Sequence, residues 1–176
     1  MVQRKKSQIW VETVVYTLIG LSIIGIVLGI VKPAIEEKRD SISIRQSIET
    51  LNYLDGKISE VISTGAGNTR QVSLKIGKGK LIFDSLNNSI EIFMEKTQSE
   101  FSEPGKEIEI GGNVKALTVK RGSLYDVTLK LDYNNQVDIT YKGGENEQVL
   151  QQAAVAYDVW VKNNGVVGNL TNIDFS

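Results

Sequence analysis

An uninterrupted apolar run near the N-terminus constrains this chain more than any other feature. Nineteen consecutive uncharged, mostly apolar residues lie between Thr13 and Val31, and as a helix they would extend about 28 Å. That length matches the hydrocarbon core of a bilayer. The run is longer than the roughly 7 to 15 apolar residues of a cleaved secretory signal, and no Ala-x-Ala-like cleavage site follows it. The sequence therefore predicts a transmembrane helix that stays in the protein.

The charges on either side of this helix predict its orientation. Arg4, Lys5 and Lys6 precede it, whereas the stretch from Lys32 to Asp40 carries charges of both signs. Because basic flanks are retained in the cytoplasm, we expect the N-terminus inside and the residues beyond Lys32 outside the cell membrane. Pro33, at the outer boundary, is expected to kink or interrupt the helix.

A second helical pattern follows Pro33. Six apolar residues recur at spacings of 3 and 4, the period of one helix face, with charged residues between them. They are Ile44, Ile48, Leu51, Leu54, Ile58 and Val61. Glycines between Thr64 and Asn68 are suited to ending the helix. Residues 34–68 are therefore expected to form an amphipathic extension and its cap, whose apolar face needs a surface to cover.

After Arg70 the apolar period changes from 3.6 to 2, which is typical of strands with one buried face. Strands around Val72–Ile76, Leu81–Phe83 and Ile90–Met94 are expected to form a meander. The clearest pattern in the chain predicts a hairpin of Val127–Tyr133 and Val137–Tyr141, joined by a two-residue turn at Asn134-Asn135.

Further strands are expected near Ile108–Ile110, Val114–Val119 and Val155–Val161. The segment Gly143–Gln152 reads as a polar connection with a short helical turn, and Asn163-Asn164-Gly165 as a turn. Seven or eight antiparallel strands over residues 69–176 result. The predicted class is α+β: a long N-terminal helix, membrane-embedded in its first half, packs through its amphipathic second half on an antiparallel β-rich head.

Composition excludes much catalytic chemistry. The chain has no Cys and no His, and its 20 basic and 21 acidic residues give a net charge of −1. Disulfides, Cys/His zinc sites and imidazole catalysis are excluded, and nothing indicates nucleic-acid binding. Ser-x-x-Lys, Gly-x-Ser-x-Gly and P-loop patterns are absent. We therefore expect no enzymatic activity, no catalytic residues, no cofactor and no metal.

Two groups of polar residues fit a structural role better than a catalytic or metal-binding one. Glu91, Glu95, Glu107 and Glu109 alternate with apolar residues or lie in loops, which is typical of a solvated strand face. The oxygen-bearing residues around the Asn134-Asn135 turn lack the spacing of a calcium loop, and a hairpin turn explains them more simply.

Two features of the apolar run go beyond a simple anchor. Glu12 lies at its start, where a carboxylate costs on the order of 2.5 to 3.5 kcal/mol at mid-membrane and less near the interface, so it needs a partner. Gly25 and Gly29 form a GxxxG motif, with Ser22 one turn earlier, on a face that allows another helix to approach closely. Such a glycine pair also occurs by chance in membrane helices, and both interpretations stay open.

Two Asn-x-Ser/Thr sequons begin at Asn87 and Asn169. On an exported domain each is a possible site of glycosylation. In a chain rich in asparagine both are also expected as random occurrences.

The first thirty residues resemble those of a type IV prepilin, in particular the archaeal kind with a class III signal peptide. The resemblance rests on a short basic leader, Ser7 before the cut, Gln8 at the first mature position, Glu12 at the fifth, and an apolar helix after it. It implies that a prepilin peptidase removes residues 1–7 and that residues 8–33 first span the membrane and then enter a filament core.

The resemblance also implies a function and its partners. The protein would be a structural subunit of a pilus-like surface filament for adhesion, motility or secretion, built by an assembly platform from copies of itself or related pilins. Glu12 would neutralise the free N-terminal amine of its own or a neighbouring subunit and so favour the correct stagger, because an unpaired charge in an apolar core is costly. Alternatively, Glu12 lies at the cytoplasmic interface of a lone anchor, and the protein is a membrane-tethered extracellular binding module that does not polymerise.

Overall fold

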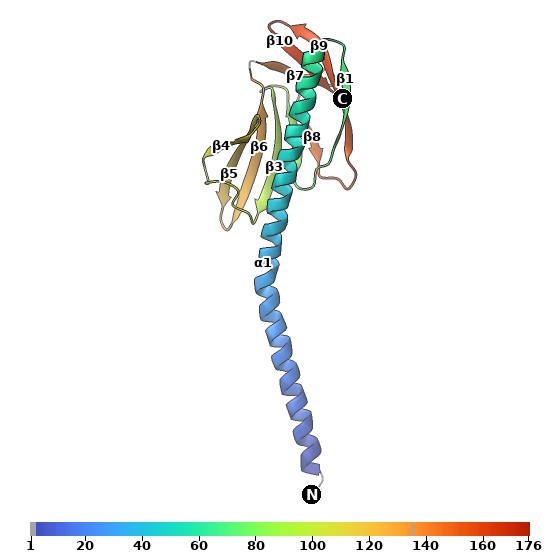
Figure 1. Ribbon diagram of the computed structural model, residues 1–176. Coiled ribbons are helices and arrows are strands. Elements are labelled where there is room, and N and C mark those ends of the chain that lie inside the picture. Colours follow the sequence, from blue (N-terminus) through green and yellow to red (C-terminus); the bar gives the residue numbers. More distant parts are fainter. Residues whose placement is uncertain (1–2, 135) are drawn as a thin grey trace. The chain divides into compact units, whose positions relative to one another are not determined.

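The computed structural model describes the backbone of residues 3–134 and 136–176, and the side chains from Trp10 onward except Asn135. These residues form one helix and ten strands (Figure 1). The chain divides into two compact units, one up to Lys38 and one from Arg39 to Ser176. Helix α1 (Gln3–Thr64) contributes to both units. We call the second unit, with helical residues 39–64 and all the strands, the head.

Helix α1 continues through Pro33 without a break, so an interruption there is excluded. Proline has a φ that suits a helix, and its cost there is one missing N–H and a clash with the carbonyl four residues earlier. The helical hydrogen bonds before and after Pro33, in a helix that extends from Gln3 to Thr64, offset that cost.

The strands of the head form two sheets. One, sheet A, has the order β1-β9-β10-β7, and the other, sheet B, has the order β4-β5-β6-β3-β2-β8. The strands are β1 (Thr69–Leu74), β2 (Lys80–Asp84), β3 (Ser89–Thr97), β4 (Glu107–Gly111), β5 (Val114–Arg121), β6 (Leu124–Asp132), β7 (Val137–Tyr141), β8 (Gln148–Gln151), β9 (Tyr157–Val167) and β10 (Leu170–Phe175). Seven of the eight strand pairings are antiparallel, but β10 and β7 run parallel. The head is thus rich in antiparallel pairing without being purely antiparallel, and it has more strands than the sequence predicts.

The expected hairpin around Asn134-Asn135 is wrong. Strand β6 pairs with β3 and β5 in sheet B, whereas β7 pairs with β10 in sheet A. The turn, whose Asn135 lies outside the described residues, passes the chain from one sheet to the other. Alternation correctly indicates which side chains are buried, but it does not identify the neighbouring strand, because both sheets bury residues in the same core.

The structure also differs from three other local predictions. Strands β2 and β3 form the predicted hairpin, but β1 pairs with β9 instead of joining a meander. The segment expected to be a polar connection contains β8, which pairs with β2 at the edge of sheet B. The expected turn at Asn163–Gly165 lies inside β9, where the register with β10 shifts by one residue. A bulge accommodates the extra residue, so the strand continues to Val167.

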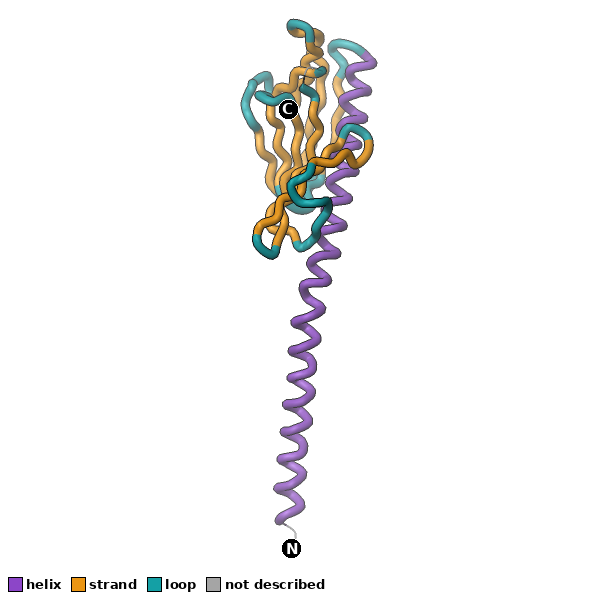
Figure 2. Tube along the Cα trace, turned by 90° about the vertical axis from the view of Figure 1, so that its left-hand side faces the viewer, coloured by secondary structure: helices purple, strands orange, loops and turns teal. Residues whose placement is uncertain are grey.

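The second half of helix α1 covers the sheets, as its apolar stripe predicts (Figure 2). The helical residues that are at most 1% exposed are Ile44, Leu51, Leu54, Ile58 and Val61. Ile48 is partly buried, and Ser47, on the neighbouring position of the helix, is buried. These side chains join one hydrophobic cluster with residues from both sheets, so the head has a single core.

Candidate functional site

The first half of helix α1 exposes apolar side chains on all sides. Trp10 is 76% exposed and Ile30 is 69% exposed. Other exposed large apolar residues of this segment are Val11, Val14, Val15, Tyr16, Leu18, Ile19, Leu21, Ile23, Ile24, Ile26, Val27, Leu28 and Val31. A helix that is apolar all round belongs in lipid or in the middle of other helices. By length and composition the helix could cross a membrane.

Ser22, Gly25 and Gly29 lie one turn apart along one face of this helix, as expected from their spacing. A Cβ atom added to either glycine would meet nothing within 4 Å. The Ser22 hydroxyl donates a 2.7 Å hydrogen bond to the carbonyl oxygen of Leu18 in its own helix. This bond satisfies the hydroxyl without a partner helix, so the face offers close backbone approach as its main contribution to packing.

Glu12 lies in the first turn of the helix whose side chains are described, and it is exposed. Among the side chains described, from residues 10 to 134 and 136 to 176, none forms an ion pair or a hydrogen bond with Glu12. Its carboxylate is therefore available to a group outside this part of the chain. The side chains of Ser7 and Gln8, on either side of the expected cut, lie outside those described, and their backbone belongs to helix α1.

A buried carboxylate anchors the start of the helical part of the head. Asp40 is 7% exposed, and its carboxylate accepts hydrogen bonds from the Lys78 ammonium group and from the backbone N–H of Gln98, the latter at 2.7 Å. Lys78 precedes β2 and Gln98 follows β3. Three separate segments are thereby held together, and the buried charge is both paired and hydrogen-bonded.

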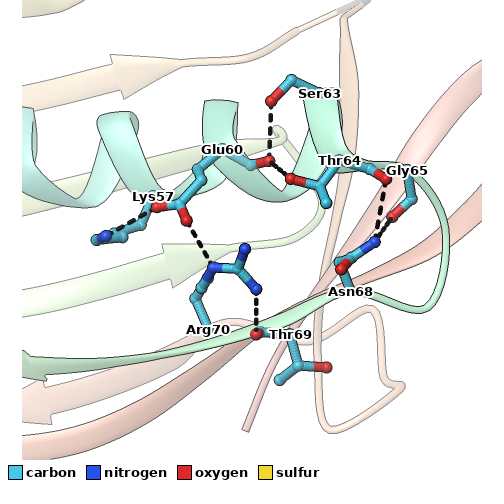
Figure 3. A network of polar contacts seen from close by, with 8 residues as sticks. All are labelled: Lys57, Glu60, Ser63, Thr64, Gly65, Asn68, Thr69 and Arg70. Carbon is cyan, nitrogen blue, oxygen red and sulfur yellow. Dashed lines mark hydrogen bonds and ion pairs between the residues drawn. The ribbon is translucent and has the colours of Figure 1, made fainter.

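A second polar cluster holds the last turns of α1 to the start of β1 (Figure 3). Glu60 accepts a hydrogen bond of 2.8 Å from Lys57 and one of 2.6 Å from Arg70. These two bonds lower the pKa of Glu60 to about 2, with the charges of both cations adding to the effect. The Asn68 side-chain amide caps the helix by donating to the carbonyl oxygens of Thr64 and Gly65. The residues around Gly65, whose φ is +96°, end the helix as the sequence predicts.

A third link joins the helix to the turn between β6 and β7. The buried Tyr133 hydroxyl donates to Asp55, whose other oxygen accepts a 3.0 Å hydrogen bond from Asn113. Burial, the bond to Asp55 and the charge of Asp55 together raise the pKa of Tyr133 well above its usual range. The phenol therefore stays protonated and remains a hydrogen-bond donor to Asp55.

Several carboxylates of sheet B lie in ion pairs. Glu91 pairs with Lys130, and Lys115 lies within 3.8 Å of Glu107 and 3.6 Å of Asp132. A surface hollow of about 320 Å³ is lined by Glu109, Gly112, Asn113, Lys115, Asp132, Asn134 and Gln136. Lys115 and its ion-pair partner Asp132 both line this hollow. Among the described residues no group of three metal-binding side chains is found.

The two sequons differ in their surroundings. Asn87, in the turn between β2 and β3, donates its side-chain amide to Asp84 at 2.7 Å. Asn169 is exposed in the turn between β9 and β10, and its side chain forms no hydrogen bond with any other described residue. Both asparagines are at the surface of the head.

The polar residues that fasten the helix to the sheets are not among those predicted from the sequence. Asp40 and Ser47 continue the buried stripe at spacings of 4 and 3 from Ile44. A charged residue in phase with an apolar face is a signal that could identify Asp40 as buried and paired. No comparable sequence signal identifies Arg70 as the partner of Glu60.

Comparisons of the chain with protein-family models, with curated proteins and with solved structures found no match. A functional assignment therefore depends on the residues and their geometry.

Proposed function

We propose that this chain is a structural subunit of a type IV pilus-like surface filament and resides in a membrane before assembly. The observation that carries the proposal is the uncovered apolar surface of helix α1 from Trp10 to Val31. Lipid covers such a surface in the membrane, and the same helices from neighbouring subunits cover it in a filament core. The folded head, with its own closed core, remains outside that bundle.

Glu12 favours the filament over a simple anchor. A carboxylate at the start of an apolar helix is costly unless it has a partner, and no described side chain supplies one. A cut between Ser7 and Gln8 would create a free amine four residues before Glu12. The amine of the same subunit or of its neighbour can then pair with Glu12, and the energetic cost of leaving either charge unpaired sets the stagger of adjacent subunits.

The proposed path begins with insertion. Arg4, Lys5 and Lys6 keep the N-terminus in the cytoplasm, so the head is exported. A prepilin peptidase then cuts on the cytoplasmic side, and an assembly platform moves helix α1 from the bilayer into a bundle of copies of this chain or of related pilins. The small residues Ser22, Gly25 and Gly29 provide the closest helix contacts there.

The experiment that tests this proposal combines shearing, imaging and N-terminal mass analysis. Sheared source cells are expected to release the protein in fibres visible by electron microscopy, with Gln8 as its first residue. Release of no fibres, together with an intact leader in the membrane fraction, would contradict the proposal and favour the tethered binding module.

A further inference from the structure

The turn between β9 and β10 combines a free sequon with exposed apolar side chains. Val166 is 72% exposed and Val167 is 59% exposed, immediately before the turn. Asn169 follows Gly168, whose positive φ of 63° forms the turn. In the antiparallel register Leu170 lies opposite Val167, and Thr171 lies opposite Val166. The head therefore presents two valines beside an asparagine whose amide has no partner among the described residues.

In the sequon at Asn169, both the asparagine that would be modified and the threonine are accessible to solvent. The Asn169 side chain is exposed, and Thr171 is partly exposed. The Thr171 hydroxyl, like the Asn169 amide, makes no hydrogen bond with the rest of the described chain. Neither the fold nor a hydrogen-bond network would be disturbed by a substituent on the amide nitrogen of Asn169.

The sequon at Asn87 is held in the fold at all three positions. The Asn87 amide donates to Asp84 at 2.7 Å. The Asn88 side chain accepts a 2.8 Å hydrogen bond from the backbone N–H of Ile139, and Ser89 is fully buried. In the folded head this sequon cannot present its amide and its hydroxyl together.

We propose that Asn169, and not Asn87, carries an N-linked glycan that covers the exposed valines of the β9–β10 turn. The inference rests on the proposed function, because the head meets a glycosyl donor only if it is exported. In the modification, the amide nitrogen of Asn169 forms a bond to the anomeric carbon of a lipid-linked sugar phosphate. The bond from that carbon to the phosphate oxygen breaks, the lipid phosphate leaves with the bonding electrons, and the amide loses one proton.

Tryptic peptides of the protein from its source cells separate the two sequons. Cleavage after Lys80, Lys96 and Lys162 places Asn87 in peptide 81–96 and Asn169 in peptide 163–176. We expect peptide 163–176 to be heavier by the mass of one or more sugar residues, with fragment ions that assign the sugar to Asn169. Peptide 81–96 is expected at its unmodified mass. An unmodified peptide 163–176, or a sugar on peptide 81–96, would overturn the proposal.

Matched variants test the chemistry and the covering role. Thr171→Val removes the hydroxyl that the sequon requires and should abolish the added mass, whereas Thr171→Ser and Asn87→Gln should retain it. Added mass that persists in Thr171→Val would overturn the assignment. Asn169→Gln is expected to bind more of a hydrophobic dye than Asn87→Gln, and equal binding would overturn the covering role.

The same samples distinguish a failure of this inference from a failure of the proposed function. Sheared fibres whose Asn169 is unmodified would overturn the glycan and leave the filament intact. Protein that carries sugar at Asn169 but is recovered only as monomers in the membrane fraction would support the glycan and contradict the filament.

Discussion

The side-chain amide of Asn163 in β9 donates a 3.0 Å hydrogen bond to the backbone carbonyl of Val61 in helix α1, 102 residues earlier. Both residues are buried. The carbonyl oxygen of the same side chain accepts a 2.8 Å hydrogen bond from the backbone N–H of Gly165, at the bulge in β9. One asparagine therefore fixes the bulge and joins the last turn of the helix to the strand.

Replacement of Asn163 by alanine is expected to lower the free energy of unfolding by about 1–3 kcal/mol, because it leaves buried polar groups without their partner. Denaturant unfolding of the full chain in detergent measures the change. Asn134→Ala is the control, since Asn134 is exposed and its side chain bonds no described residue; it should change stability by less than about 0.5 kcal/mol. Equal effects of the two substitutions would show that the buried link is unimportant.

The helix face in the head is expected to be sensitive to loss of volume. Leu54 is fully buried, so Leu54→Ala should lower the free energy of unfolding by about 2–5 kcal/mol through lost burial and a cavity. Ile42 lies on the same helix and is 56% exposed. Ile42→Ala should change thermal stability little, and a comparable loss in both variants would argue against the packing described for this face.

Glu60 predicts a specific pH dependence. Its pKa is lowered in the folded head to about 2 by Lys57 and Arg70, so its contribution to stability is fully present above its ordinary value near 4.5 and is lost as the pH falls toward 2. Glu60→Gln lacks this contribution at every pH. In urea unfolding at pH 5 to 2, the difference between the wild type and Glu60→Gln should therefore shrink as the pH falls. A constant difference would exclude this ion pair as its cause.

Glu12 is expected to act in assembly and not in insertion. Glu12→Gln removes the charge with little change of shape, so the protein should reach the membrane at normal levels but form few fibres. Fractionation followed by electron microscopy of sheared material measures both steps. Glu37→Gln, an exposed carboxylate beyond the apolar segment, serves as the control and should assemble normally. Normal fibres from Glu12→Gln would refute the charge-pairing account.

If helices pack through the face of Ser22, Gly25 and Gly29, a larger side chain should reduce their association more on this face than on the opposite one. Gly29→Leu should reduce helix association, because the larger side chain prevents close backbone approach. Gly20→Leu makes the same change on the opposite side of the helix and should be tolerated better. Neither leucine Cβ meets an atom within 4 Å in the single chain, so the head should unfold as in the wild type. Cross-linking in membranes compares association, and equal losses would contradict a specific face.

Local patterns predict much of this fold. The stripe from Ile44 to Val61 identifies the covering helix, and alternation in β6 and β7 identifies their buried faces. Pairing is harder to predict, because β7 and β10 are joined by contacts that no local pattern encodes. The expectation of a hairpin at Asn134 fails for this reason. Edge strand β8 is short and only partly buried, so its pattern is too weak to distinguish it from a loop.

At the candidate site, the apolar character of residues 10 to 31 follows directly from the sequence. The ion pairs that hold the helix to the strands of the head do not follow from the sequence. Asp40 pairs with Lys78 and Glu60 with Arg70 only because the tertiary fold brings distant segments together.

Strand β10 lies between β9 and β7 in sheet A, and among the described strands it is the only one that pairs with β7. Loss of β10 would therefore detach β7 from the sheet as well. It would also remove Ile173 and Phe175, which are fully buried, from the core. The order of the strands thus makes β10 the element on which the cohesion of sheet A depends.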